Sequence, residues 1–195
     1  MMKRSTLNRR NVVSTLLGQR GDALVVTGLG STTWDAMAAG DNDLNFYLWG
    51  GMGGAAMTGL GLAIAQPKRR VLVVTGDGEM LMGIGSLATV AVQAPGNLSI
   101  VVIDNEHYGE TGGQPTHTRA GVDLPGMAAA AGFPITETVR TKTALKSFID
   151  TVYQAQGPIL GCIKVESASE PLVLPERDGP YLKSRFRNAL LEPNT

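Results

Sequence analysis

Unbroken apolar runs alternate along this chain with segments whose apolar residues recur at helical spacing. The runs predict buried strands, and the segments between them predict helices. We expect strands at residues 23–26, 71–75, 98–103 and 159–165, with 45–49 either a strand or extended chain. We expect helices at residues 6–18, 33–39, 54–66, 80–94, 124–132 and 142–155. Because uniformly apolar strands are buried on both faces, the pattern predicts an α/β fold, a parallel sheet flanked by helices on both faces.

Two stretches lie outside this alternation. A polar, glycine-rich loop is expected over residues 105–122, and a proline-rich surface tail is expected after the last strand. No internal repeat or low-complexity segment divides the chain. We therefore expect one domain over 1–195, with a core at about 8–166 and a tail at 167–195.

Composition and charge narrow the classes of function. Hydrophobic residues make up 43% of the chain, and 17 basic and 17 acidic residues give a formal net charge of +0. A neutral chain offers no electrostatic basis for binding nucleic acid or an anionic membrane, and no stretch approaches the ~20 apolar residues of a membrane span. The single cysteine, Cys162, is interpreted as a small buried hydrophobe. The arginine pair at 9–10 precedes an apolar run too short for an export signal, so we expect a cytoplasmic protein.

Two neighbouring predicted strands end in polar residues that suit a divalent cation. Asp77 lies between two glycines after the strand at 71–75, and Asn105 follows the strand at 98–103, 28 positions later. In a parallel sheet, ligands bind at the carboxyl ends of the strands. Mg²⁺ takes oxygen ligands, usually one or two from the protein together with phosphate oxygens. The flanking glycines and the helix expected near Glu79 would let backbone N–H groups approach those phosphates.

The spaced pair of motifs resembles that of thiamine-diphosphate enzymes. In that family a Gly-Asp-Gly sequence, here Gly76-Asp77-Gly78, is followed after about 25–30 residues by Asn, here Asn105. Asp104 stands where the family has Asn or a similar residue. The resemblance implies that Asp77 and Asn105 bind Mg²⁺ through their side chains and His107 through its backbone carbonyl.

The resemblance extends over about residues 8–166 and implies roles for other positions. Gly50 would accept a hydrogen bond from the aminopyrimidine through its carbonyl, and Met52 would support the bent conformation of the cofactor. Glu79 would act mainly through its backbone, and His117 is a candidate for substrate contact or proton transfer. The implied cofactor-binding residues are Gly28, Gly30, Ser31, Gly50, Gly51, Met52, Gly76, Asp77, Gly78, Glu79, Asn105, His107, Tyr108 and Gly109.

Within the family, residues 76–90 and 104–116 look like the β subunit of sulfopyruvate/phosphonopyruvate decarboxylase. That subunit is a stand-alone diphosphate domain. The resemblance implies a separate pyrimidine-domain α subunit that carries the activating glutamate, and a hetero-oligomer of α2β2 form or larger. The implied reaction is decarboxylation of a 2-oxoacid, that of a carbon–carbon lyase.

Other functions remain open at this point. A β subunit of a 2-oxoacid oxidoreductase shares a similar loop, but Cys162 alone cannot hold an iron–sulfur cluster. A thiamine-diphosphate carboligase or synthase would use the same motif, and a regulatory scaffold would keep the fold without the chemistry. The Gly-x-Gly-x-x-Ala sequence at 51–56 also matches a dinucleotide-binding pattern, although its expected acidic residue would have to be Asp77.

Overall fold

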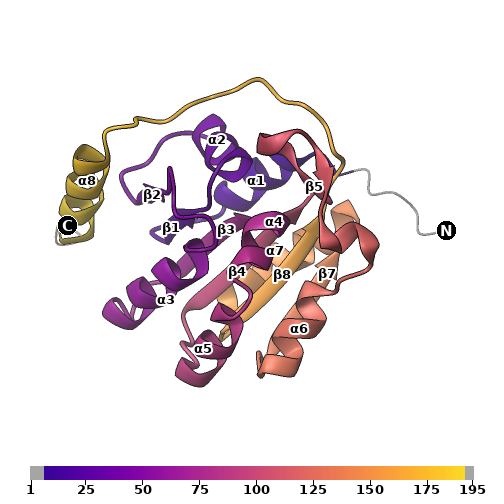
Figure 1. Cartoon of the computed structure of the whole chain (residues 1–195). Coiled ribbons are helices and arrows are strands. Elements are labelled where there is room, and N and C mark those ends of the chain that lie inside the picture. Colours follow the sequence, from indigo (N-terminus) through magenta and orange to yellow (C-terminus); the bar gives the residue numbers. More distant parts are fainter. Residues whose placement is uncertain (1–6, 192–195) are drawn as a thin grey trace.

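A computed structural model describes residues 7–191 of the chain as one parallel sheet between two layers of helices (Figure 1). The six strands lie in the order β2-β1-β3-β4-β8-β7, and every neighbouring pair is parallel. They are β1 (Leu24–Thr27), β2 (Asn45–Tyr47), β3 (Val71–Gly76), β4 (Leu98–Asp104), β7 (Ile135–Val139) and β8 (Ile159–Lys164). The predicted α/β fold is confirmed.

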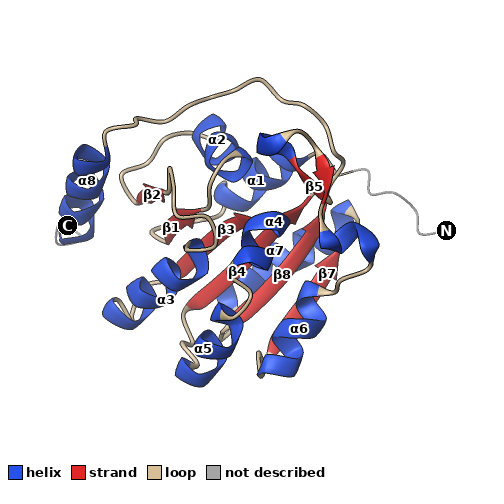
Figure 2. Cartoon of the chain, in the orientation of Figure 1, coloured by secondary structure: helices blue, strands red, loops and turns tan. Residues whose placement is uncertain are grey.

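The helices cover both faces of the sheet (Figure 2). One apolar core lies between the sheet and α1 and α7, and the other lies between the sheet and α3, α5 and α6. Side chains of β3 alternate between them, since Leu72 and Val74 belong to the first and Val71 and Val73 to the second. The helices are α1 (Arg9–Leu17), α2 (Ser31–Ala38), α3 (Ala55–Ala65), α4 (Asp77–Met82), α5 (Ser86–Gln93), α6 (Leu124–Ala131), α7 (Lys142–Gln154) and α8 (Gly179–Leu191).

Local sequence explains where α1 and α7 begin. The side chains of Asn8 and Thr141 cap the two helices by accepting from the backbone N–H groups three residues on. Along α7, Leu145, Phe148 and Ile149 are buried at the spacing of one helix face. Among the described helices, none has the length and apolar character needed to cross a bilayer.

The prediction of a single helix at residues 80–94 is wrong. The structure has α4 beginning at Asp77 and ending at Met82, and a separate α5 from Ser86. At Gly83 the chain passes so close to the Gly53 backbone that a side chain would overlap the Gly53 carbonyl oxygen. The two helices are therefore separated at a close approach of two backbones, which local propensity does not reveal.

Three further segments differ from the sequence-based expectation. Strand β7 was not predicted, because Thr136, Glu137 and Thr138 make it polar at the sheet edge. The loop at 105–122 contains the hairpin β5 (His107–Tyr108) and β6 (Gln114–Pro115), with 3₁₀ turns at Gly109–Thr111 and His117–Ala120.

The third segment that differs from the expectation follows residue 166. It was predicted as a surface tail, but it ends in the helix α8. Figure 1 shows this segment arching over the molecule to place α8 beside β2. Leu182 and Phe186 of α8 are buried, and Phe186 packs against Phe46 with ring centroids 5.5 Å apart. The folded part of the chain therefore extends past the predicted core.

Candidate functional site

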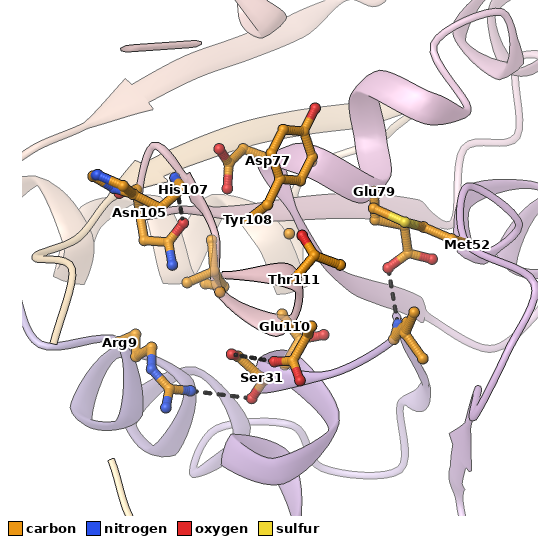
Figure 3. A pocket seen from close by; sticks show the side chains of 16 residues that line it. Arg9, Ser31, Met52, Asp77, Glu79, Asn105, His107, Tyr108, Glu110 and Thr111 are labelled. Carbon is orange, nitrogen blue, oxygen red and sulfur yellow. Dashed lines mark hydrogen bonds between the residues drawn. The ribbon is translucent and has the colours of Figure 1, made fainter. Parts of the chain in front are cut away.

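A pocket opens at the carboxyl edge of the sheet, above β3 and β4 (Figure 3). The structure brings many of the predicted site residues together there, from turns far apart in the sequence. Those lining the pocket are Ser31, Met52, Gly76, Asp77, Gly78, Glu79, Asn105, His107, Tyr108 and Gly109. Sequence analysis missed Arg9, Leu29, Thr32, Ile103, Glu110 and Thr111, which also line it.

Some predicted residues lie outside the lining of this pocket. His117 is exposed and faces a neighbouring hollow shared with Thr116 and Arg119. Four other predicted residues belong to the same turns as the lining residues Leu29, Ser31 and Met52 but are not part of the lining, namely Gly28, Gly30, Gly50 and Gly51. Their proposed contacts with a ligand stay predictions.

Asp77 is buried at the start of α4, with 2% of its surface exposed. Its Oδ2 atom accepts hydrogen bonds from the hydroxyl groups of Thr116 at 2.5 Å and Thr118 at 3.2 Å. Burial and the negative charge of nearby Asp104 raise the pKa of Asp77 to about 6, although the two threonine hydroxyls act in the opposite direction. A divalent cation beside this carboxylate would relieve both unfavourable effects.

Asp104 forms a second, fully buried acidic position behind Asp77. Lys164 Nζ lies 2.6 Å from Asp104 Oδ2, and Thr118 donates to Asp104 Oδ1 at 2.9 Å. The Thr118 hydroxyl therefore lies within hydrogen-bonding distance of both Asp77 and Asp104, and its one proton can be donated to either carboxylate but not to both at once. Burial lowers the pKa of Lys164, but its hydrogen bonds to Asp104 and Glu106 outweigh this effect and leave the pKa above its usual value. The structure thus supplies a compensating cation for the aspartate that departs from the family pattern.

The turn after β4 places oxygen atoms at the edge of the pocket. Asn105 Oδ1 accepts from the backbone N–H of His107 at 2.9 Å, and Glu106 between them has a left-handed φ of 63°. The His107 ring contacts the Asn105 carbonyl at 2.8 Å through Nδ1 and Arg119 at 2.7 Å through Nε2. Asp77, Asn105 and the His107 carbonyl are all hard oxygen donors of the kind that Mg²⁺ prefers.

The two glycines around Asp77 have different surroundings. A side chain at Gly78 would overlap the ring of Tyr108, whereas a Cβ at Gly76 would meet nothing within 4 Å. Gly78 is therefore explained by packing within the protein. The open space at Gly76 leaves the backbone accessible to a ligand, beside the first-turn N–H groups of α4 that lack intrahelical partners.

The opposite wall of the pocket carries a cation. Arg9, buried in α1, forms an ion pair with Asp35 and donates to the Ser31 carbonyl at 3.3 Å. Ser31 in turn donates to Glu110 at 3.3 Å. Burial raises the pKa of Glu110, while Ser31 and Arg9 act to lower it. The sequence signal that could have indicated Arg9 was its position in the first turn of a helix facing this sheet edge.

Comparisons with known proteins agree with this geometry. The family model described as thiamine pyrophosphate enzyme, C-terminal TPP binding domain, matches residues 29–161. Sulfopyruvate decarboxylase subunit beta from Methanothermobacter thermautotrophicus is 34% identical over 92% of this chain and 94% of that protein. Phosphonopyruvate decarboxylase from Streptomyces viridochromogenes is 39% identical over 88% of this chain, which spans 43% of that protein.

A solved structure shows the same architecture. The X-ray structure of a candidate thiamin diphosphate-dependent enzyme isolated from Mycobacterium smegmatis superposes with a TM-score of 0.72 and 25% sequence identity. The match covers 83% of this chain and 32% of that one. The fold, the family match and the relatives together show that the chain belongs to the thiamine pyrophosphate enzymes and contains their C-terminal TPP-binding domain.

Proposed function

We propose that this chain is the diphosphate-binding component of a Mg²⁺-dependent 2-oxoacid decarboxylase that uses thiamine diphosphate. The observation that carries the proposal is the buried aspartate Asp77. It directly follows β3 at the carboxyl edge of the sheet, within the residues that match the TPP-binding domain. Relatives covering most of this chain are named as decarboxylases of sulfopyruvate and phosphonopyruvate, which favours a 2-oxoacid with a second anionic group as substrate.

The residues present fit the cofactor and its metal ion. Asp77, Asn105 and the His107 carbonyl would hold Mg²⁺, and the backbone at Gly76–Glu79 would approach the diphosphate. When bound, thiamine diphosphate supplies a thiazolium that stabilises the carbanion left by loss of CO₂. Met52, which is 38% exposed on the pocket wall, would support the bent conformation of the cofactor.

A partner is part of the proposal because the pocket is small. Its volume is about 120 Å³, whereas sites for ligands of drug size have volumes of roughly 300–1,000 Å³. This chain therefore offers one wall of a cofactor site. The second wall, with the glutamate that activates the cofactor, would come from a pyrimidine domain. We place that domain on a separate subunit because a relative of which this chain covers 94% is named a subunit beta.

A reconstitution assay tests this function. The chain would be mixed with the product of the adjacent reading frame, and CO₂ release from sulfopyruvate and phosphonopyruvate would be followed with Mg²⁺ and thiamine diphosphate. We expect activity in the mixture and none with Asp77→Ala. A regulatory scaffold would leave the partner's activity unchanged by that substitution, and a carboligase would give a condensed product in place of an aldehyde.

A further inference from the structure

Glu79, directly after the Gly-Asp-Gly motif, is a buried carboxylate with 5% of its surface exposed. Its side chain leaves α4 and reaches the turn at 27–31, where Oε2 accepts from the backbone N–H of Leu29 at 3.0 Å (Figure 3). The same oxygen accepts from the hydroxyl of Thr75 at 2.9 Å. Glu79 therefore joins the start of α4 to the end of β3 and to a turn 50 residues away.

The second oxygen of this carboxylate, Glu79 Oε1, is buried and has no hydrogen-bond partner among the described residues. Burial raises the pKa of Glu79, and hydrogen bonding from Thr75 and from the Leu29 backbone acts against that rise. The contacts of the carboxylate with β3 and with turn 27–31 therefore run through Oε2.

The absence of a side chain at Gly28 leaves room for the Glu79 carboxylate. A Cβ atom at Gly28 would overlap Glu79 Oε2 and would come within 3.0 Å of Thr75 Oγ1. Gly28 does not have a positive φ, so its backbone would accept an ordinary side chain. The space that glycine leaves at position 28 is therefore occupied by the carboxylate of Glu79.

We propose that Glu79 is a positioning residue that fixes turn 27–31 against the start of α4. That turn carries Leu29 and Ser31 on the pocket wall, so its position relative to α4 sets the shape of the cofactor site. The link between turn 27–31 and α4 follows from the fold alone. Its effect on cofactor binding rests on the proposed function, and the two parts are tested separately.

A double-substitution cycle tests the link between Glu79 and turn 27–31. In the wild-type chain, Gly28→Ala forces an overlap and should lower the thermal midpoint by about 5 °C or more. In a Glu79→Ala background the same substitution should cost less than about 2 °C, since only the Thr75 hydroxyl has to turn away. Asp150→Ala, on the exposed face of α7, is the matched control and should combine additively with Gly28→Ala.

Two conservative variants allow the same test if Glu79→Ala does not fold. Glu79→Asp is one methylene shorter, so it should also relieve the overlap that Gly28→Ala creates. Glu79→Gln keeps the length and should leave the full cost of Gly28→Ala in place. An equal cost of Gly28→Ala in the wild-type, Glu79→Ala and Glu79→Asp backgrounds would overturn the link.

Cofactor binding tests the consequence for the site. Titration of the full chain with thiamine diphosphate in excess Mg²⁺ should give a Kd raised about tenfold by Glu79→Ala, the equivalent of one hydrogen bond to a charged group. Glu79→Gln should restore most of the affinity. Leu182→Ala on α8 serves as a control that destabilises the fold away from the site and should leave Kd unchanged. Wild-type affinity in Glu79→Ala would refute the positioning role, whereas absence of binding by the wild-type chain would count against the proposed function.

Discussion

Replacing Lys164 with methionine isolates the buried charge pair behind the candidate metal site. The Asp104 side chain is fully buried and that of Lys164 is 11% exposed, so the substitution leaves a carboxylate in the interior without its cation. Methionine preserves most of the aliphatic length, so packing changes little. The effect should therefore report the charge pair.

The expected loss of stability depends on the hydrogen bonds that Asp104 retains in the variant. Removing one partner of a buried ion pair costs about 3–5 kcal/mol of stability. Asp104 keeps hydrogen bonds from Thr118, the Glu106 backbone and the Cys162 thiol, which favours the lower end of that range. The second partner of Lys164, Glu106, is 38% exposed and contributes little. We expect a loss of about 3 kcal/mol, or roughly 6–12 °C in the thermal midpoint of a chain of this size.

Urea denaturation at neutral pH, followed by circular dichroism, measures this loss. Lys183→Met, an exposed lysine on α8, is the matched control and should change stability by less than about 0.5 kcal/mol. Asp104→Asn in the Lys164→Met background should recover most of the loss, because the neutral amide no longer needs a cation. A loss below about 1 kcal/mol, or no recovery in the double variant, would refute the assignment of Lys164 as the compensating charge.

Two further predictions concern Asp77 and α8. The pKa of Asp77 is raised to about 6 in the folded, metal-free chain, so the stability it confers is present below about pH 4 and is lost as the pH rises through 6. Asp77→Asn should remove that loss and stabilise the metal-free chain by about 3 kcal/mol at pH 7.5 but not at pH 4. Urea denaturation at both pH values measures this, and parallel pH profiles of the two proteins would contradict it. Phe186→Ala should destabilise the chain by about 3 kcal/mol without changing its affinity for thiamine diphosphate. A loss of stability below about 1 kcal/mol in thermal denaturation would mean that α8 does not pack against Phe46 as described.

Much of the fold follows from the sequence because its strands are continuous apolar runs. Strand β7 and helix α8 were not predicted, because neither has a continuous or periodic apolar pattern. Strand β7 has three polar residues in a row at the sheet edge, where only Val139 is fully buried, and α8 has two buried side chains in 13 residues. Both depend on tertiary contacts, with β8 for the strand and with Phe46 for the helix.

The site was predictable where a motif fixes both residue type and spacing. Asp77 and Asn105 follow neighbouring strands, so parallel pairing of β3 and β4 brings them to one edge. The side-chain directions were not predictable. Whether Glu79 faces a ligand or turn 27–31, and which cation balances Asp104, depends on residues 50 and 60 positions away in the sequence.

Calorimetric titration of the chain with thiamine diphosphate, in the presence and absence of Mg²⁺, tests the central claim most directly. We expect weak binding that requires Mg²⁺ and is reduced about 100-fold or more by Asp77→Ala. Binding of equal affinity by the wild-type chain and Asp77→Ala would contradict the assignment of Asp77 as the residue that holds the metal ion and, through it, the diphosphate.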